Sequence, residues 1–173
     1  RNPLFNELSE KGYFLKKTSG EPYIHRWFSW PYDKQWPHLM PSGIIDFTNP
    51  DAYNWFRDQH KKLFDIGVSV MKTDYGEAVP DDIVAFNGDS GQRLHNVYTH
   101  LYNQCVYEAA EMYSQDEPMV WGRAAWAGGQ RFPIQWGGDP QCDWEGLAAS
   151  IRGGLSWGMT GGPFFAHDIG GFA

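Results

Sequence analysis

Two acidic stretches in this sequence each follow a short apolar run. Residues 72–77, KTDYGE, come directly after residues 66–71, and residues 136–139, WGGD, close a run that begins at Phe132. An aspartate at the end of a buried strand can be a nucleophile, a base or a metal ligand. A pair of them suits glycoside hydrolysis, with one carboxylate as nucleophile and the other as acid/base. Aspartates that cap helices or stabilise loops are commoner, so residue types alone leave a structural role open for Asp74 and Asp139.

Alternating strand and helix patterns would position these residues. We expect strands over 43–47, 68–71, 118–121, 132–136 and 163–166, and helices over 95–112 and 144–152. A further helix should begin at the capping Asn49 with Pro50 as its first residue and stop at Gly67. The strands at 43–47 and 68–71 would then form a βαβ unit around this helix. Such alternation predicts a parallel sheet.

The polar residues favour one parallel architecture over another. A doubly wound sheet usually carries a Gly-rich phosphate loop, and the sequence shows none. A (β/α)₈ TIM barrel places its chemistry at the carboxyl ends of the strands. Polar residues follow the predicted strands there each time: Asp46, Asp74, Arg123, Asp139 and the pair His167-Asp168. Because a full barrel needs about 250 residues, residues 1–173, with about five strands, would be an incomplete catalytic domain. Both ends of the sequence look like cuts through a larger domain.

Composition narrows the range of partners. The chain of 173 residues carries a formal charge of −7, with no basic run that would indicate a nucleic-acid partner. It has no run of about 18 apolar residues, so we expect no membrane partner. Nine tryptophans fit a Trp-rich core or a sugar site, because flat sugar faces stack on aromatic rings, and composition alone favours the core. We expect Cys105 and Cys142 to be buried free thiols, which favours a reducing compartment, cytoplasmic rather than secreted.

Six segments in a fixed order carry a resemblance to a known family. They are NPLFNELSEKGYFLK, IIDFTNPDAYNWF, GVSVMKTDYGE, RFPIQWGGD, SIRGGLSWGM and HDIGGF. Over nearly its whole length the chain resembles the family 31 glycoside hydrolases, nearest the bacterial α-xylosidase branch. The resemblance implies a retaining α-glycosidase that acts on a terminal α-linked sugar, a xyloside first of all, without cofactor or metal. Its substrate would be an oligosaccharide or small α-glycoside, and the full-length protein could be a homo-oligomer.

The resemblance also implies roles for individual residues. Asp74 would be the nucleophile and Asp139 the acid/base, its pKa raised by apolar neighbours such as Trp136. Lys72 and Arg123 would hold Asp74 as an anion and bind sugar hydroxyls; the alternatives are a salt bridge from Lys72 to Glu77 and a surface role for Arg123. We interpret Glu77 as a hydrogen-bond partner within its loop, for example of Lys72.

Further substrate contacts are implied at the aromatic residues and at the HDIGG motif. Trp136 would wall the sugar subsite, with Trp36, or Trp30 in its place, as a second contact. His167 would bind the sugar, unless it is a core histidine bonded to a backbone carbonyl. Asp168 would bind sugar or orient Arg123 or His167. Other family activities remain open, namely α-glucosidase, α-galactosidase and transglycosylase, as does an inactive sugar-binding fragment. Release of sulfoquinovose ranks low, because no basic cluster suited to a sulfonate stands out.

Overall fold

The computed structural model describes residues 3–26, 28–29, 34–35, 42–132 and 134–172. They divide into two compact units. The first unit comprises Arg1–Trp55 and Val79–His95, and the second comprises Phe56–Ala78 and Asn96–Ala173.

Short antiparallel pairs make up the sheet structure of the first unit. Helix α1 (Pro3–Glu10) precedes them. Strand β1 (Lys16–Lys17) pairs with β7 (Ile83–Val84), β2 (Ile24–His25) with β5 (Ser42–Gly43), and β3 (Phe28–Ser29) with β4 (Lys34–Gln35). The predicted parallel strand over 43–47 is therefore wrong. Ile45 forms an antiparallel bridge to Phe14 instead, because a β-branched run specifies extended backbone without specifying its partner.

Asp46 has a structural place in this unit. Its carboxylate is buried and accepts hydrogen bonds from the Thr48 backbone and hydroxyl, at 2.9 and 2.7 Å, and from the Phe86 backbone at 2.7 Å. These bonds join the turn before helix α2 (Pro50–Gln59) to the segment after β7. Asp46 is thus one of the commoner loop-stabilising aspartates rather than a member of the predicted strand-end site.

The predicted cap and stop of the helix that follows are both present. Asn49 accepts a hydrogen bond from the Asp51 backbone at 3.0 Å, and Gly67 takes a φ of 97° beyond helix α3 (Lys61–Asp65). The single predicted helix is split at His60. There the backbone N–H donates to the Arg57 carbonyl, three residues back, and an imidazole nitrogen lies 2.9 Å from the Phe56 carbonyl. The side chain thus occupies the acceptor that a continuous helix would use.

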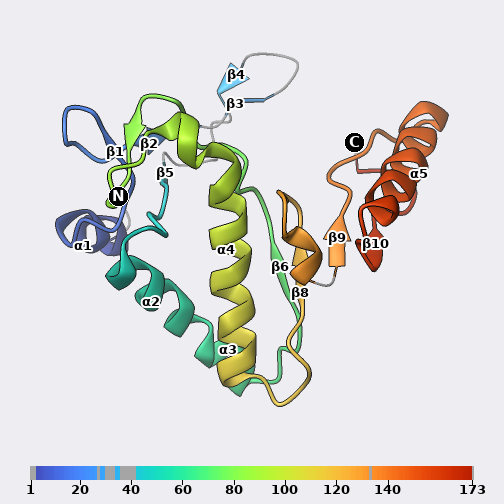
Figure 1. Cartoon of the computed structure of the whole chain (residues 1–173), viewed down its shortest axis with the longest axis horizontal. Helices are drawn as coiled ribbons and strands as arrows, with labels where there is room; N and C mark the ends of the chain where they lie inside the picture. The colour runs from blue at the N-terminus through green and yellow to red at the C-terminus, as the bar shows by residue number, and fades with distance from the viewer. Residues whose placement is uncertain (1–2, 27, 30–33, 36–41, 133, 173) are drawn as a thin grey trace. The chain divides into compact units, whose positions relative to one another are not determined.

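A four-stranded parallel sheet is the centre of the second unit (Figure 1). Its order is β10 (Phe164–Ala166), β9 (Ile134–Trp136), β8 (Val120–Gly122) and β6 (Met71–Thr73). Each neighbouring pair is parallel, with Lys72 opposite Trp121 and Ala166 opposite Trp136. Strands β8, β9 and β10 lie where the sequence predicts strands, whereas β6 overlaps the predicted segment 68–71 only at Met71 and continues to Thr73.

Helix α4 (Gly91–Tyr113) supplies most of the core behind this sheet. Its Val106 packs with Val120 of β8 and with Phe132, which follows the short 3₁₀ helix η1 (Gly129–Arg131), while Ala109 and Ala110 pack with Phe64. Met71 of β6 contacts both clusters. The predicted helix over 95–112 is confirmed.

Helix α5 (Trp144–Met159) lies beside β10 (Figure 1). The Asp143 carboxylate caps it by accepting a hydrogen bond from the Gly146 backbone at 2.6 Å. Cys142, in the loop before this cap, is exposed, whereas Cys105 on α4 is buried. The prediction of two buried thiols is therefore right for Cys105 and wrong for Cys142, because the loop that joins β9 to α5 runs over the surface.

Candidate active site

The parallel sheet brings the predicted site residues to one edge. Asp74 directly follows β6, Arg123 follows β8, and His167 follows β10, while Asp139 lies three residues beyond β9. Because the strands are parallel, these positions all lie at carboxyl ends. The same edge carries the chemistry in parallel barrels.

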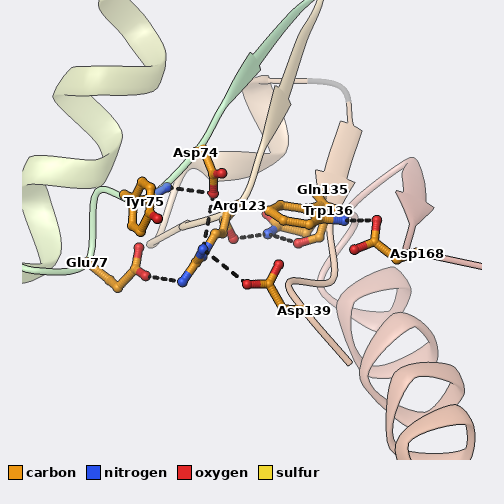
Figure 2. Close-up of polar contacts among 8 residues, drawn as sticks. All are labelled: Asp74, Tyr75, Glu77, Arg123, Gln135, Trp136, Asp139 and Asp168. Carbon is orange, nitrogen blue, oxygen red and sulfur yellow. Dashed lines mark hydrogen bonds and ion pairs between the residues drawn. The ribbon is translucent and has the colours of Figure 1, made fainter. Parts of the chain in front are cut away.

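Arg123 is the centre of the polar cluster (Figure 2). Its Nη1 donates to Asp74 Oδ1 at 3.1 Å and lies 3.8 Å from Asp139 Oδ2. Its Nη2 donates to Glu77 Oε1 at 2.6 Å. The Arg123 side chain is 24% exposed, whereas the three carboxylate side chains are between 39% and 45% exposed. One partly buried cation is therefore shared by carboxylates that open to solvent.

Opposing effects act on the pKa of Arg123. Burial lowers the pKa of the guanidinium, but the charges of Glu77, Asp74 and Asp139 raise it further than burial lowers it, so the pKa ends above its usual range. The guanidinium stays charged at every pH at which an enzyme works. It therefore supplies a constant positive charge to both aspartates.

The loop after β6 places a backbone N–H donor beside the Asp74 carboxylate. Tyr75 has a φ of 61°, the left-handed region that non-glycine residues rarely occupy, and its N–H donates to Asp74 Oδ1 at 2.9 Å. Gly76 continues the turn at a φ of 99°. The Tyr75 ring lies under Arg123, with its centroid 4.9 Å from the guanidinium carbon. This turn thus supplies both a hydrogen bond to the carboxylate and a platform for its cationic partner.

Helix α4 holds the backbone on both sides of this cluster. Thr73 Oγ1 donates to Asn103 Oδ1 at 2.5 Å, and Asn103 Nδ2 donates to the Ala124 carbonyl at 2.9 Å. Thr73 precedes Asp74, and Ala124 follows Arg123. One buried amide therefore sets the spacing of the two strand ends. Asn103 is not among the residues expected from the sequence, where its only signal is a polar residue within the apolar stripe of a helix.

Lys72 lies on aromatic rings, whereas the sequence suggested a contact with the carboxylate of Asp74 or of Glu77. Its ammonium lies 3.2 Å from the centroid of the Trp136 ring and 5.8 Å from that of Trp121. Glu77, the alternative partner for Lys72, pairs with Arg123 instead. The reason is the turn at Tyr75 and Gly76, which carries Glu77 away from the strand and toward β8.

Trp136 joins the ends of β9 and β10. The side chain is buried, with 2% of the residue exposed, and its Nε1–H donates to Asp168 Oδ1 at 3.3 Å. The Asp168 carboxylate therefore orients Trp136, where the sequence suggested Arg123 or His167. The Nδ1 atom of His167 lies 3.1 Å from the Asp168 carbonyl oxygen. This is the backbone contact expected of a core histidine, and it fixes the orientation of the imidazole.

Two other predicted contacts, Trp36 and Trp30, lie outside the described residues. Gln135 is a further residue of the cluster that the sequence motifs do not indicate. Its Nε2 donates to the Arg123 carbonyl at 2.5 Å and to the Trp136 carbonyl at 3.0 Å. Gln135 thereby ties the end of β8 to the end of β9.

A pocket of about 890 Å³ adjoins the cluster. Arg123, Asp139, Glu77 and Trp136 contribute to its wall, together with residues of α5. Asp74 is not among the lining residues, so this space lies on the Asp139 side of the cluster rather than between the two aspartates. Within the described part of the chain, His, Cys, Asp and Glu form no group that could hold a metal ion. No helix among the same residues is long and apolar enough to cross a membrane.

Comparison with known proteins decides the family. Residues 1–173 match the description "Glycosyl hydrolases family 31 TIM-barrel domain". The chain belongs to glycoside hydrolase family 31. Its parallel sheet is accordingly part of a family 31 TIM barrel, as the strand-end pattern predicted.

The family 31 relatives include several activities. An α-xylosidase of Emericella nidulans and one of Lactiplantibacillus pentosus are each 38% identical over 99% of this chain. A sulfoquinovosidase of Escherichia coli is 33% identical over 98% of it. Among solved structures, a family 31 sulfoquinovosidase from E. rectale, in complex with an aza-sugar inhibitor, superimposes with a TM-score of 0.84 at 34% identity over 99% of the chain. The chain spans about a fifth of these curated relatives, from 21% to 24%, and a quarter, 25%, of that solved chain.

Proposed function

We propose that the whole protein carrying this chain is a retaining α-glycosidase, with Asp74 as nucleophile and Asp139 as acid/base. The observation that carries the proposal is the shared contact of both carboxylates with Arg123 Nη1, at 3.1 and 3.8 Å. Two atoms that near to a third are at most about 7 Å apart, a limit that admits the retaining spacing of about 5–5.5 Å. Family membership supports the same reaction class.

The first half of the reaction would form a covalent intermediate. An ionised Asp74 oxygen attacks the anomeric carbon, and the bond from that carbon to the leaving oxygen breaks. Asp139 gives its proton to the leaving oxygen, so the products are a β-glycosyl ester of Asp74 and the free alcohol. The guanidinium of Arg123 and the Tyr75 N–H each donate a hydrogen bond to Asp74 Oδ1.

The second half would regenerate the enzyme. Asp139, now a carboxylate, takes a proton from water as the water oxygen attacks the anomeric carbon. The ester bond breaks and the charge returns to Asp74, which releases the α-configured sugar. Six further residues would contact the sugar or support the residues that do: Trp36, Lys72, Arg123, Trp136, His167 and Asp168. The exposed ammonium of Lys72 offers hydrogen-bond donors for the hydroxyl groups of a sugar ring.

Xylosides are the first substrate class to test. Two α-xylosidases at 38% identity support this choice. Glycosides of sulfoquinovose are the second, because sulfoquinovosidases are 33% and 34% identical to the chain. The low rank that the sequence analysis gave to sulfoquinovose is therefore raised. The ammonium of Lys72, which lies on the rings of Trp136 and Trp121, adds a positive charge two residues before Asp74.

Side-by-side turnover assays test the proposal. The whole protein would be given the 4-nitrophenyl α-glycosides of xylose, glucose, galactose and sulfoquinovose. We expect turnover of the xyloside, loss of about 10³-fold or more in Asp74→Ala, and retention of the α configuration in the first-formed sugar. Asp58→Ala, which removes an exposed carboxylate paired with Arg57, is the matched control and should leave turnover unchanged.

Azide separates the two roles. In Asp74→Ala, azide should restore turnover by attacking the anomeric carbon in place of the carboxylate and should give a β-glycosyl azide. In Asp139→Ala, azide should attack the glycosyl-enzyme and give the α-glycosyl azide. Inversion of configuration by the wild-type protein would contradict the retaining mechanism, and full activity of Asp74→Ala would remove Asp74 from its role.

A further inference from the structure

Glu77 makes a short ion-pair contact at the candidate site. Its Oε1 accepts a hydrogen bond from Arg123 Nη2 at 2.6 Å, shorter than the 3.1 Å from Nη1 to Asp74 or the 3.8 Å from Nη1 to Asp139. Figure 2 shows Glu77 on one side of the guanidinium with Asp74 and Asp139 on the others. Glu77 follows the nucleophile by three residues, so it cannot reach the acid/base position across the scissile bond.

Because the guanidinium is rigid, the contact with Glu77 restricts the orientation of the whole group. The group is planar and rigid, so fixing Nη2 fixes the direction of Nη1 as well. The Tyr75 ring fixes the plane from a second side, at 4.9 Å. The Arg123 backbone is anchored separately, by its N–H to the Thr73 carbonyl at 3.0 Å. Glu77 therefore acts on the end of the side chain and not on the strand.

We propose that Glu77 is a positioning residue that holds Arg123 so that one nitrogen of the guanidinium serves Asp74 and Asp139 in turn. The inference rests on the proposed function, because it assigns the two aspartates alternating charges. Before attack, Asp74 is the anion and Nη1 is its donor. In the glycosyl-enzyme, Asp74 is an uncharged ester and Asp139 becomes the anion. An arginine free to move would have to be repositioned between the two halves, whereas Glu77 keeps it in place throughout.

Other titratable groups near Glu77 and Arg123 could affect how activity depends on pH. The titratable residues on the surrounding elements are Lys72 on β6, Tyr102 on α4, His167 and Asp168 after β10, and Glu145 on α5. None of them has a recorded ion pair with Glu77 or with the Arg123 guanidinium, in the part of the chain that the structure describes. Removal of Glu77 should therefore act most directly on the position of the Arg123 guanidinium and on the net charge around it.

Two substitutions in the whole protein separate charge from hydrogen bonding. Glu77→Gln keeps an acceptor oxygen for Nη2 and removes the charge, so kcat should stay within about threefold of wild type. Loss of the negative charge of Glu77 should move the pH profile of kcat/KM to lower pH. Glu77→Ala removes the acceptor as well, and its kcat should fall by about 10-fold or more. Asp65→Asn, which breaks the exposed pair with Lys61, is the matched control and should change neither quantity.

A crystal structure of Glu77→Ala tests the positioning without relying on turnover. We expect Arg123 Nη1 to leave at least one of the two aspartates. Two results would overturn the inference. One is a structure of Glu77→Ala in which Arg123 Nη1 still lies beside both aspartates. The other is a Glu77→Ala protein that melts at a lower temperature but keeps the wild-type kcat and pH profile. If the wild-type protein turns over no glycoside while Arg123 moves in Glu77→Ala, the proposed function fails and the positioning by Glu77 stands.

Discussion

At the scale of single residues, the site depends on the forked shape of one arginine. Arg123 uses one nitrogen for Glu77 and the other for Asp74 and Asp139. A lysine would carry the same charge to a single point and could not make both sets of contacts. The positive charge and the fork therefore make separable contributions.

Arg123→Lys measures the contribution of the fork. The variant loses at least one charge-assisted hydrogen bond, worth about 1.5–3 kcal/mol, so kcat/KM on an aryl α-glycoside should fall by about 10- to 100-fold. Arg152→Lys on the exposed surface of α5 is the control and should behave as wild type. A loss of less than about threefold in Arg123→Lys would mean that charge alone suffices.

At the scale of elements, helix α4 fixes the distance between the ends of β6 and β8. Asn103 bonds to Thr73 and to the Ala124 carbonyl, the residues next to Asp74 and Arg123. Asn103→Ala leaves both partners without their bond in a buried place, so the second unit should lose about 2–4 kcal/mol of stability. Activity of the protein that remains folded should fall too, because the two strand ends are no longer held together.

Gln104 on the same helix provides the comparison. Its amide donates to Glu108 at 2.8 Å in a partly buried i,i+4 pair, so Gln104→Ala should cost about 0.5 kcal/mol or less. Thermal melts and kcat/KM of the two variants, side by side in the whole protein, check the prediction. Equal effects would show that the Asn103 bridge has no special role.

The same elements show what the sequence could and could not predict. The four parallel strands and helices α4 and α5 were predicted, because short apolar runs bounded by turn residues depend on local chemistry. The segment at 43–47 was assigned to the wrong sheet, because pairing depends on a distant partner, here Phe14. Contacts across strands were missed for the same reason. Adjacency along the chain suggested Lys72 for Glu77, whereas two positive φ angles turn Glu77 to Arg123.

At the scale of the whole molecule, helix α5 carries an exposed apolar stripe. Leu147, Ile151, Leu155 and Met159 recur every fourth residue and are between 40% and 89% exposed. A recombinant chain of residues 1–173 should therefore self-associate, as shown by sedimentation velocity at micromolar concentration. The double variant Ile151→Lys with Leu155→Lys should be less associated. A sharply melting monomer of the unmodified chain would contradict this expectation.

Alkaline pH should destabilise the second unit through the buried Cys105 and the partly buried Tyr102 of α4. Burial and the nearby Glu108 raise the pKa of Cys105 to about 12 from an ordinary 9.0, and burial with the charge of Asp74 raises that of Tyr102 to about 12. Because the folded state holds these protons more tightly than the unfolded chain, their stabilisation is complete below pH 9 and is lost as pH rises toward 12. Cys105 should contribute a slope of about 1.4 kcal/mol per pH unit from pH 9 upward.

Replacing the thiol isolates the Cys105 contribution. Cys105→Ala should be less stable than wild type at pH 8, because it leaves a small cavity, but should lose stability less steeply between pH 9 and 11. Cys142→Ala removes the exposed thiol and should follow the wild-type curve. Melting temperatures from near-ultraviolet circular dichroism, under reducing conditions and across this pH range, give the three slopes. Parallel curves for wild type and Cys105→Ala would mean that the Cys105 proton is not linked to folding. A shallower curve would place that proton in the core behind the strands that carry Asp74 and Arg123.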